Sequence, residues 1–299
     1  MKIANLHDSA SGEFAVGHIK AVWRDLGREA GTRSVGLRRI EISEDHFSTP
    51  AHEHGGDEEE GLLWQDGKTY AVHAQDCIVH RPKRGAHTLR GGAGGLDVVV
   101  FAQRLDPSLT ALPRAGIAWS FPRWVELGEG DWPFAREAAA GPPECPPPEA
   151  ERPRNVVALS EVTPILDGRA RRLGMAAGAV ATGLNYVVLP AGTEGAPAHC
   201  HSLEEEIFLV LDGDGVLELW GPGERAPDEH PLRAGDAISR PPGTGVAHAL
   251  RPGAHGLTYL AYGTREPGDM CFYPQQGRVS LRGLGIALRS PEIDYLPRL

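Results

Sequence analysis

Residues 197–201 read Pro-Ala-His-Cys-His and residues 50–54 read Pro-Ala-His-Glu-His, so the two stretches match at an offset of 147 residues. The same offset aligns an earlier segment: Leu26, Gly27, Gly31, Gly36 and Leu37 match Leu173, Gly174, Gly178, Gly183 and Leu184. After one residue is dropped, Glu58–Glu60 falls on Glu204–Glu206, and from His87 and His248 onward the offset is 161 residues. So long a match, interrupted only by changes in loop length, predicts two copies of one module in tandem.

Short apolar runs bounded by turn residues dominate both copies, and glycine (38) and proline (25) are abundant among the 299 residues. Such runs are typical of β-strands rather than of amphipathic helices. The predicted strands are 37–42, 62–64, 97–101, 184–189, 207–211, 216–220 and 257–262. The sequence therefore predicts an all-β protein of two antiparallel barrels or sandwiches that pack together.

A proline-rich stretch over 141–148 separates the copies. Such a run cannot join the interior of a sheet, so it predicts an extended and fairly stiff connector. We therefore expect an N-terminal barrel over 1–128, a linker over 129–155 with a short helix over 134–140, and a C-terminal barrel over 156–299.

The composition argues against several classes of protein. A net charge of −10 disfavours a nucleic-acid ligand. No apolar run approaches the ~18–20 residues that a membrane span needs, and the first residues lack the features of a secretory signal. The four cysteines have no metal-knuckle or CxxC spacing. We expect a reduced, cytoplasmic protein that acts on a small molecule.

The second copy carries four residues that suit a metal site. His199 and His201 are two apart on a predicted strand, so both imidazoles can face inward. Glu206 opens the next strand, and His248 follows a turn at 241–243. Three imidazoles and one carboxylate suit a divalent Mn, Fe, Ni, Co or Zn ion. Four such ligands on an octahedral ion leave two positions for substrate, water or dioxygen.

The spacing of these residues resembles the two motifs of the cupin superfamily. The first motif is represented by Gly195-x(3)-His199-x-His201-x(4)-Glu206-x(6)-Gly213, and the second by Gly235-Asp236-x(4)-Pro241-x-Gly243-x(4)-His248. The family's usual Asn after the last His is absent, and that Asn is not a ligand. The resemblance covers roughly residues 30–105 and 175–265. It implies a bicupin, with two tandem cupin-type antiparallel β-barrels of the double-stranded β-helix or jelly-roll kind.

The first copy keeps every ligand type, in the order His52, His54, Glu60 and His87. The gap from His54 to Glu60 is one residue wider than in the second copy, so Glu59 is an alternative ligand. Strand parity with Glu206 and the shared spacing to the following Asp-Gly favour Glu60. We expect one or two divalent ions per chain, and if only one site binds metal, we expect the second.

Other residues near the motifs have structural or functional interpretations. Cys77 and Cys200 are predicted to be packed core thiols, and all but one glutamate of each Glu triplet to be partly solvated. The repeat-related arginines, Arg90/Arg251 and Arg104/Arg265, are predicted to form structural salt bridges, with a grip on a substrate carboxylate as the alternative. Candidate substrate contacts near the second motif of each copy are His73, His80, Arg81, Arg84 and Arg240.

The resemblance implies only a class of activity, because cupins include dioxygenases, decarboxylases, isomerases, hydrolases and binding proteins. We expect an enzyme that uses a mononuclear divalent metal on a small organic substrate, above all a dioxygenase, with Glu206 or Glu60 as a catalytic base. The alternatives are a redox-neutral decarboxylase or isomerase, and a non-catalytic binding or sensing protein with a structural metal. The resemblance also implies that the chain can form a homodimer.

Overall fold

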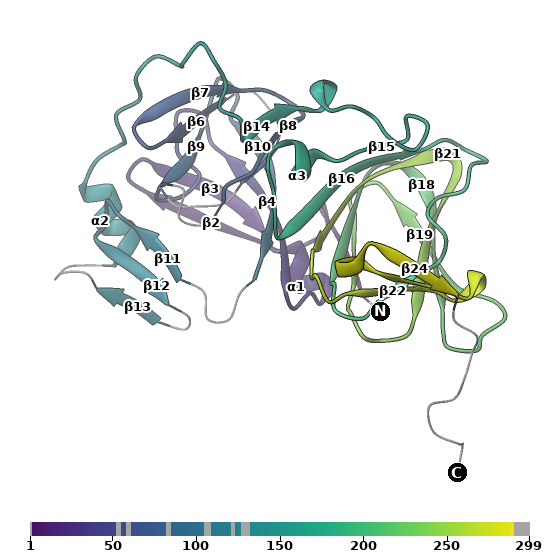
Figure 1. Cartoon of the computed structure of the whole chain (residues 1–299). Helices are drawn as coiled ribbons and strands as arrows, with labels where there is room; N and C mark the ends of the chain where they lie inside the picture. Colours follow the sequence, from purple (N-terminus) through teal and green to yellow (C-terminus); the bar gives the residue numbers. More distant parts are fainter. Residues whose placement is uncertain are drawn as a thin grey trace.

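The computed structural model describes residues 2–51, 55–57, 61–81, 85–104, 109–120, 123–126 and 132–289, in which β-strands dominate and helices are short. The chain folds into two β-rich halves that lie side by side, the first in purple and blue and the second in green and yellow (Figure 1). The all-β prediction is therefore confirmed.

The first copy forms two antiparallel sheets around one core. The larger sheet has the strand order β2–β3–β4–β10–β5 and the smaller has the order β7–β6–β9. Their bounds are β2 Ser11–Val16, β3 Ile19–Arg24, β4 Val35–Ile42, β5 Gly55–Asp57, β6 Gly61–Gln65, β7 Lys68–Val72, β9 His87–Gly91 and β10 Leu96–Gln103. Alternate apolar side chains of these strands, among them Ile42, Leu63 and Val98, are buried in a common cluster.

The second copy is built on a seven-stranded sheet of order β1–β20–β18–β21–β16–β15, with β19 paired to β18. A smaller sheet has the order β17–β22–β23–β24. The bounds are β1 Ile3–Asn5, β15 Ala170–Arg171, β16 Thr182–Leu189, β17 Cys200–His201, β18 Glu206–Trp220, β19 Asp228–Arg233, β20 Asp236–Arg240, β21 Ala247–Thr264, β22 Met270–Tyr273, β23 Arg278–Leu281 and β24 Ile286–Arg289. The strands predicted over 207–211 and 216–220 are thus two arms of one long strand, β18.

A glycine bend in β18 curls this sheet. Gly213 has a φ of +84°, and a Cβ there would lie 2.2 Å from the carbonyl oxygen of Gly256 on β21, so no other residue fits without displacing the backbone. The pairing register with β21 shifts on both sides of the bend. Along the ladder Glu206 pairs with Gly263, whereas Leu219 pairs with His248. On a flat sheet Glu206 and His248 would be far apart, and the curl brings them together.

Each half lends one strand to the other. β1, at the N-terminus, pairs with β20 of the second copy. β14 (Val156–Ala158), which follows the connector, pairs with β8 (Asp76–Ile78) of the first copy. Between the halves, α1 (Leu26–Ala30) and β4 pack their apolar side chains against Leu209 of β18 and Tyr262 of β21. The halves therefore meet in a shared apolar cluster in addition to their own cores. The predicted boundaries at 128 and 156 stay a prediction.

The connector lies along the β6–β7 hairpin. Trp64 donates a hydrogen bond to the carbonyl oxygen of Glu144 (3.0 Å), and Thr69 donates one to that of Pro146 (2.6 Å). The helix predicted over 134–140 is confirmed as α2 (Pro133–Ala139). The remaining elements are β11 Leu109–Leu112, β12 Ile117–Ser120, β13 Arg123–Glu126, α3 Leu173–Ala176 and the 3-10 turns Leu159–Glu161, Pro274–Gln276 and Arg282–Leu284. Within the described ranges, no helix is long and apolar enough to cross a membrane.

Candidate metal centre

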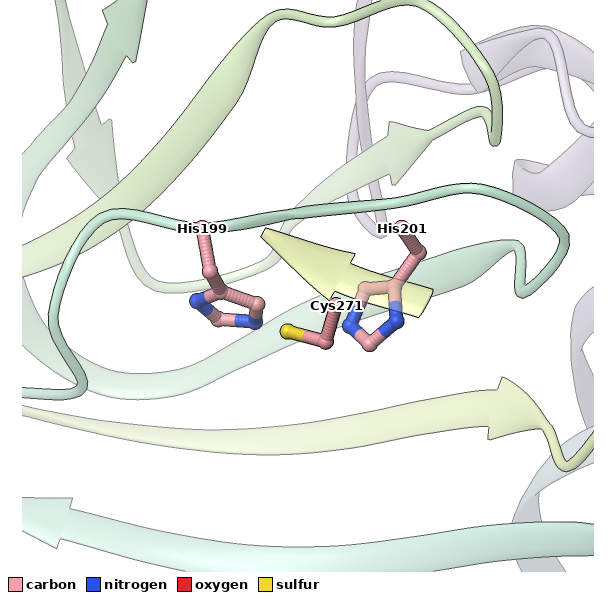
Figure 2. Close-up of side chains that lie close together, drawn as sticks. All are labelled: His199, His201 and Cys271. Atoms are coloured by element: carbon pink, nitrogen blue, oxygen red, sulfur yellow. The ribbon is translucent and has the colours of Figure 1, made fainter. Parts of the chain in front are cut away.

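Three strands of the second copy bring its four predicted ligands together. His201 belongs to β17 and His199 directly precedes that strand, Glu206 is the first residue of β18, and His248 is the second residue of β21. His199 and His248 lie directly opposite each other, because each backbone N–H donates to the other's carbonyl oxygen, at 3.1 and 2.8 Å. His199 and His201 project to the same side of the chain (Figure 2), as predicted from their spacing.

The donor atoms converge on one carboxylate oxygen. Oε2 of Glu206 lies 3.1 Å from Nε2 of His248, 3.6 Å from Nε2 of His201 and 3.8 Å from Nε2 of His199. Donors bound to one ion at about 2.1 Å lie roughly 3.0–3.4 Å apart. The separations from Glu206 are close to that range. His199, Glu206 and His248 already form one group of neighbouring donors, and His201 must move toward that group to share a single divalent ion with it.

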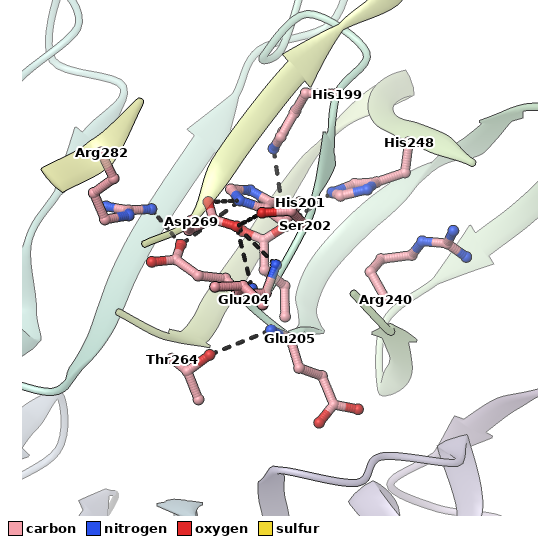
Figure 3. A network of polar contacts seen from close by, with 12 residues as sticks. His199, His201, Ser202, Glu204, Glu205, Arg240, His248, Thr264, Asp269 and Arg282 are labelled. Atoms are coloured by element: carbon pink, nitrogen blue, oxygen red, sulfur yellow. Dashed lines mark hydrogen bonds and ion pairs between the residues drawn. The ribbon is translucent and has the colours of Figure 1, made fainter. Parts of the chain in front are cut away.

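Hydrogen bonds at the other ring nitrogens orient two of the imidazoles. Nδ1 of His199 lies 2.8 Å from the carbonyl oxygen of Pro197, and Nδ1 of His201 lies 2.7 Å from Oδ2 of Asp269 (Figure 3). Each Nδ1–H therefore donates, which leaves Nε2 with the lone pair that a metal requires. The other oxygen of Asp269 accepts the backbone N–H of Leu203 at 3.0 Å, so this carboxylate is fixed in place.

The charges in the cluster are strongly coupled. Burial alone would raise the pKa of Glu206, but the hydrogen bond and charge of His248 and the charges of His201 and His199 hold that pKa well below its usual range. Burial disfavours the charged form of His201, yet Cys271, Glu206 and Asp269 together raise its pKa to about 10. Burial lowers the pKa of His248 to about 4, against the attraction of Glu206. A His201 with this pKa holds a proton on Nε2 as well, so metal binding there requires that proton to leave and the cation to take its place beside the Glu206 carboxylate.

The donor set fits a divalent metal ion. Nε2 of His248 and Oε2 of Glu206 are buried and lie 3.1 Å apart, and no other described residue forms a hydrogen bond with either atom. Buried polar atoms in proteins normally use their hydrogen-bonding capacity, so two potential metal ligands that contact only each other leave room for a further partner. Donor atoms of His199, Glu206 and His248 also lie within 4.8 Å of one another, as do those of His199, His201 and Cys271.

The neighbouring glutamates of the triplet are not solvated, contrary to expectation. Glu205 is completely buried and Glu204 is 3% exposed. Glu204 forms an ion pair with Arg282 and accepts the backbone N–H of Glu266 at 2.9 Å. Glu205 accepts hydrogen bonds from the backbone of residues 33–35 in the first copy. Sequence spacing did not reveal these roles, because each partner lies far along the chain.

Most of the predicted first-copy site lies outside the described residues. His52, His54, Glu60 and the alternative Glu59 are all among the residues not described. His87, the fourth predicted ligand, opens β9 and is 2% exposed. Its ring stacks on that of His80, with centroids 3.4 Å apart and planes 4° apart. The first site therefore stays a prediction.

The other singled-out residues divide between structural and site positions. The predicted salt bridges of repeat-related arginines are seen for Arg90 with Asp45, Arg104 with Asp25 and Arg251 with Glu218, at 2.8, 3.4 and 3.3 Å. Arg265 packs against Gly183. Cys77 is buried and Cys200 half-buried. His73 is exposed beside Asp76, Arg81 donates to the carbonyl oxygen of Gly178, and Arg84 lies outside the described residues.

Arg240 is the predicted substrate contact closest to the centre. It pairs with Glu206 in the register of β20 and β18, and its side chain is buried. Burial lowers the pKa of Arg240, while the charge of Glu206 acts in the opposite direction.

Two residues at the centre were missed from the sequence, Asp269 and Cys271. Both belong to the segment after β21, whose first-copy counterparts at the offset of 161 are Ser108 and Thr110. Matching residues between the two copies therefore could not identify them. The difference between the copies was the available signal, because only the second copy has an acidic residue and a cysteine at these two positions.

Comparisons with known proteins agree with this geometry. The model of the cupin domain family matches residues 185–253, a range that contains His199, His201, Glu206 and His248. No curated protein matches the chain. Many solved structures do match it, and three illustrate the range.

A putative sugar phosphate isomerase from Acidithiobacillus ferrooxidans is 28% identical over 43% of this chain and 80% of its own, with a TM-score of 0.38. A cupin-superfamily sugar phosphate isomerase from Silicibacter pomeroyi is 30% identical over 38% of this chain and 70% of its own, with a TM-score of 0.34. The oxalate decarboxylase of Lactobacillus farciminis, in a formate complex, is 12% identical over 89% of this chain and 86% of its own, with a TM-score of 0.59. The last match covers both halves of the fold.

Proposed function

Because the chain belongs to the cupin superfamily and has two tandem jelly-roll modules, we propose that its second module is an enzymatic centre that binds one divalent metal ion and acts on a small organic substrate. The observation that carries this proposal is the convergence of three imidazole Nε2 atoms on Oε2 of Glu206. The proposed ligands are His199, His201, Glu206 and His248.

The donor chemistry narrows the choice of ion. Imidazole and carboxylate donors suit Fe, Mn, Ni, Co or Zn, whereas an all-oxygen site would favour Mg or Ca. When bound, such an ion supplies Lewis acidity, and a redox-active one such as iron also supplies a means of activating dioxygen.

The residues around the centre favour an anionic substrate. The side chains of His199 and Glu206 are 15% and 21% exposed, so a small molecule can reach them. Arg240, opposite Glu206 on β20, is a buried positive charge that can attract a carboxylate. Glu206 is held as the carboxylate, which suits it for binding a cation. Its proposed second role as catalytic base requires it to leave the ion and the histidine charges that lower its pKa. Glu60 is the proposed equivalent in the first copy.

Two reaction classes are candidates for this centre. Dioxygenation is the first, as expected from the sequence. Redox-neutral decarboxylation or isomerisation is the second, and the whole-chain fold similarity to a protein named oxalate decarboxylase supports it. The two differ in one measurable respect, because only the first consumes dioxygen.

The test begins with the metal. The purified protein is analysed for metal content, and dioxygen uptake and carbon dioxide release are followed on a panel of small carboxylates and sugar derivatives. We expect the double substitution His199→Ala/His201→Ala to abolish both metal content and turnover. The matched control His255→Ala removes an exposed histidine of the same module and should change neither. Unchanged metal content in the double variant would refute the site, and tight binding of an unaltered ligand with no turnover would refute the enzyme.

A further inference from the structure

The strand pairing places Cys271 on the same face as a proposed metal ligand. β17 and β22 pair with His201 opposite Cys271 and with Cys200 opposite Phe272. Residues directly opposite each other in a sheet project from the same face, and successive residues alternate. Cys271 therefore faces the metal centre with His201, while Cys200 faces away. Figure 2 shows the Cys271 side chain between the rings of His199 and His201.

The separations allow the sulfur to reach an ion held by these histidines. One donor atom each from His199, His201 and Cys271 lie within 4.8 Å of one another. Nitrogen and sulfur donors on opposite sides of one ion are separated by about 4.4 Å, the sum of their bond lengths, and adjacent donors are closer. Cys271 is also 7% exposed, so its thiol lies in the protein rather than in bulk water.

Two independent features indicate that this space is built for a ligand. His248 has a side chain only 3% exposed, and its Nε2 lies 3.1 Å from Oε2 of Glu206 and forms no hydrogen bond with any other described residue. Ring contacts also hold β22, the strand that carries Cys271, beside His199. The ring of Tyr273 stacks on that of His199 at 5.5 Å, and the guanidinium of Arg278 lies 4.2 Å from the Tyr273 ring centroid.

We propose that Cys271 is a sulfur ligand of the metal ion in the second module, in addition to its histidine and glutamate ligands. The inference rests on the proposed function, since it needs an ion at this centre. On binding, the Sγ–H bond breaks, the proton leaves to solvent, and the sulfur lone pair forms the bond to the metal with no change of oxidation state. A thiolate donor shifts the preference of the site toward Zn, Fe, Co or Ni and away from Mn.

The proposal also makes the two copies chemically different. The first-copy residue at the offset of 161 from Cys271 is Thr110, which carries no sulfur. If both copies bind metal, only the second has a sulfur-ligated ion.

The test uses cobalt(II) as the probe on the full-length chain. A cobalt–thiolate bond produces an intense near-ultraviolet charge-transfer band that imidazole and carboxylate ligands do not produce. We expect this band in the wild type and in the control variant Cys200→Ser, and we expect its loss in Cys271→Ser and Cys271→Ala. We also expect cobalt affinity to fall by about tenfold or more in the Cys271 variants, since even residues outside the ligand shell account for 10–100-fold.

The outcomes separate this inference from the proposed function. Cobalt bound at one equivalent or more without a charge-transfer band in the wild type would overturn the sulfur ligand and leave the metal centre intact. A band that survives Cys271→Ser but not Cys200→Ser would overturn it as well. Failure of the wild type to bind cobalt, zinc or iron would overturn the proposed function itself. X-ray absorption on the wild type tests for sulfur in the first shell without any substitution, so a variant that fails to fold does not prevent a decision.

Discussion

Removing the carboxylate of Glu205 should destabilise the whole protein. Glu205 is completely buried where the second copy meets the first. It accepts the backbone N–H of Arg33 (2.9 Å) and Val35 (3.1 Å), as well as the backbone N–H and the hydroxyl (2.7 Å) of Ser34. One carboxylate thus satisfies three successive backbone donors of the first copy.

The magnitude follows from those contacts. A hydrogen bond to a charged group contributes about 1.5–3 kcal/mol, and a buried donor left unpaired costs about 1–3 kcal/mol. The values do not add fully, because water can enter the space left by a truncated side chain. Removing one partner of a buried charged network costs about 3–5 kcal/mol. We expect Glu205→Ala to lower the free energy of unfolding by that amount. Glu205→Gln should cost nearly as much, because its amide group brings a donor to face donors.

Urea unfolding followed by tryptophan fluorescence measures this loss, with Glu229→Ala as the matched control. Glu229 is an exposed glutamate on β19 of the same copy, and its removal should change stability by no more than about 0.5 kcal/mol. A Glu205→Ala protein within 1 kcal/mol of the wild type would refute the argument that this carboxylate joins the copies.

Three further predictions concern the centre and the shared core. Asp269→Asn should weaken metal affinity about 10–100-fold, because it loosens the contact that orients His201. Chelator competition measures the affinity, and the control Asp228→Asn should leave it unchanged. Equal metal affinities of Asp269→Asn and the wild type would contradict the orienting role. Metal at about 100 times its dissociation constant should stabilise the wild type by about 2.7 kcal/mol, and a chelator should remove this gain; a gain retained in His199→Ala/His201→Ala would place the ion elsewhere. Burial raises the pKa of Tyr262 from 10 to about 12, so folding favours its neutral form, and the wild type should lose up to roughly 2.7 kcal/mol as pH rises from 10 to 12. Tyr262→Phe should lack this loss, and parallel urea midpoints of the two proteins over that range would show that Tyr262 does not cause it.

The sequence predicted the parts of the fold that depend on local pattern. The repeat, the strands and the ligand order could be read because alternation and turn residues are local, and because two copies verify each other. The spacing of His199 and His201 was enough to predict a shared face, and Glu206 was chosen from its triplet because it opens the next predicted strand. The long bent strand β18 was read as two strands, since the glycine bend at Gly213 resembles a turn.

What the sequence did not predict depends on contacts between distant residues. Asp269 meets His201 only because β22 pairs with β17, and nothing near either residue specifies that pairing. The burial of Glu204 and Glu205 likewise follows from Arg282 at one end of the chain and from residues 33–35 at the other. A charged triplet is usually solvated, and only a tertiary partner for each member makes the exception.

The contacts of Glu204, Glu205 and Glu206 indicate that the first copy helps to position the proposed metal ligands of the second. Glu204 and Glu206 approach the two ring nitrogens of His201, at 3.7 Å from Nδ1 and 3.6 Å from Nε2. Glu205, between them, is fixed to residues 33–35 of the first copy. Because adjacent residues cannot move independently, the first copy restrains the position of Glu206 through a single peptide unit. The module interface and the metal centre are therefore mechanically linked, and the first copy has a structural role at this centre whether or not it binds an ion of its own.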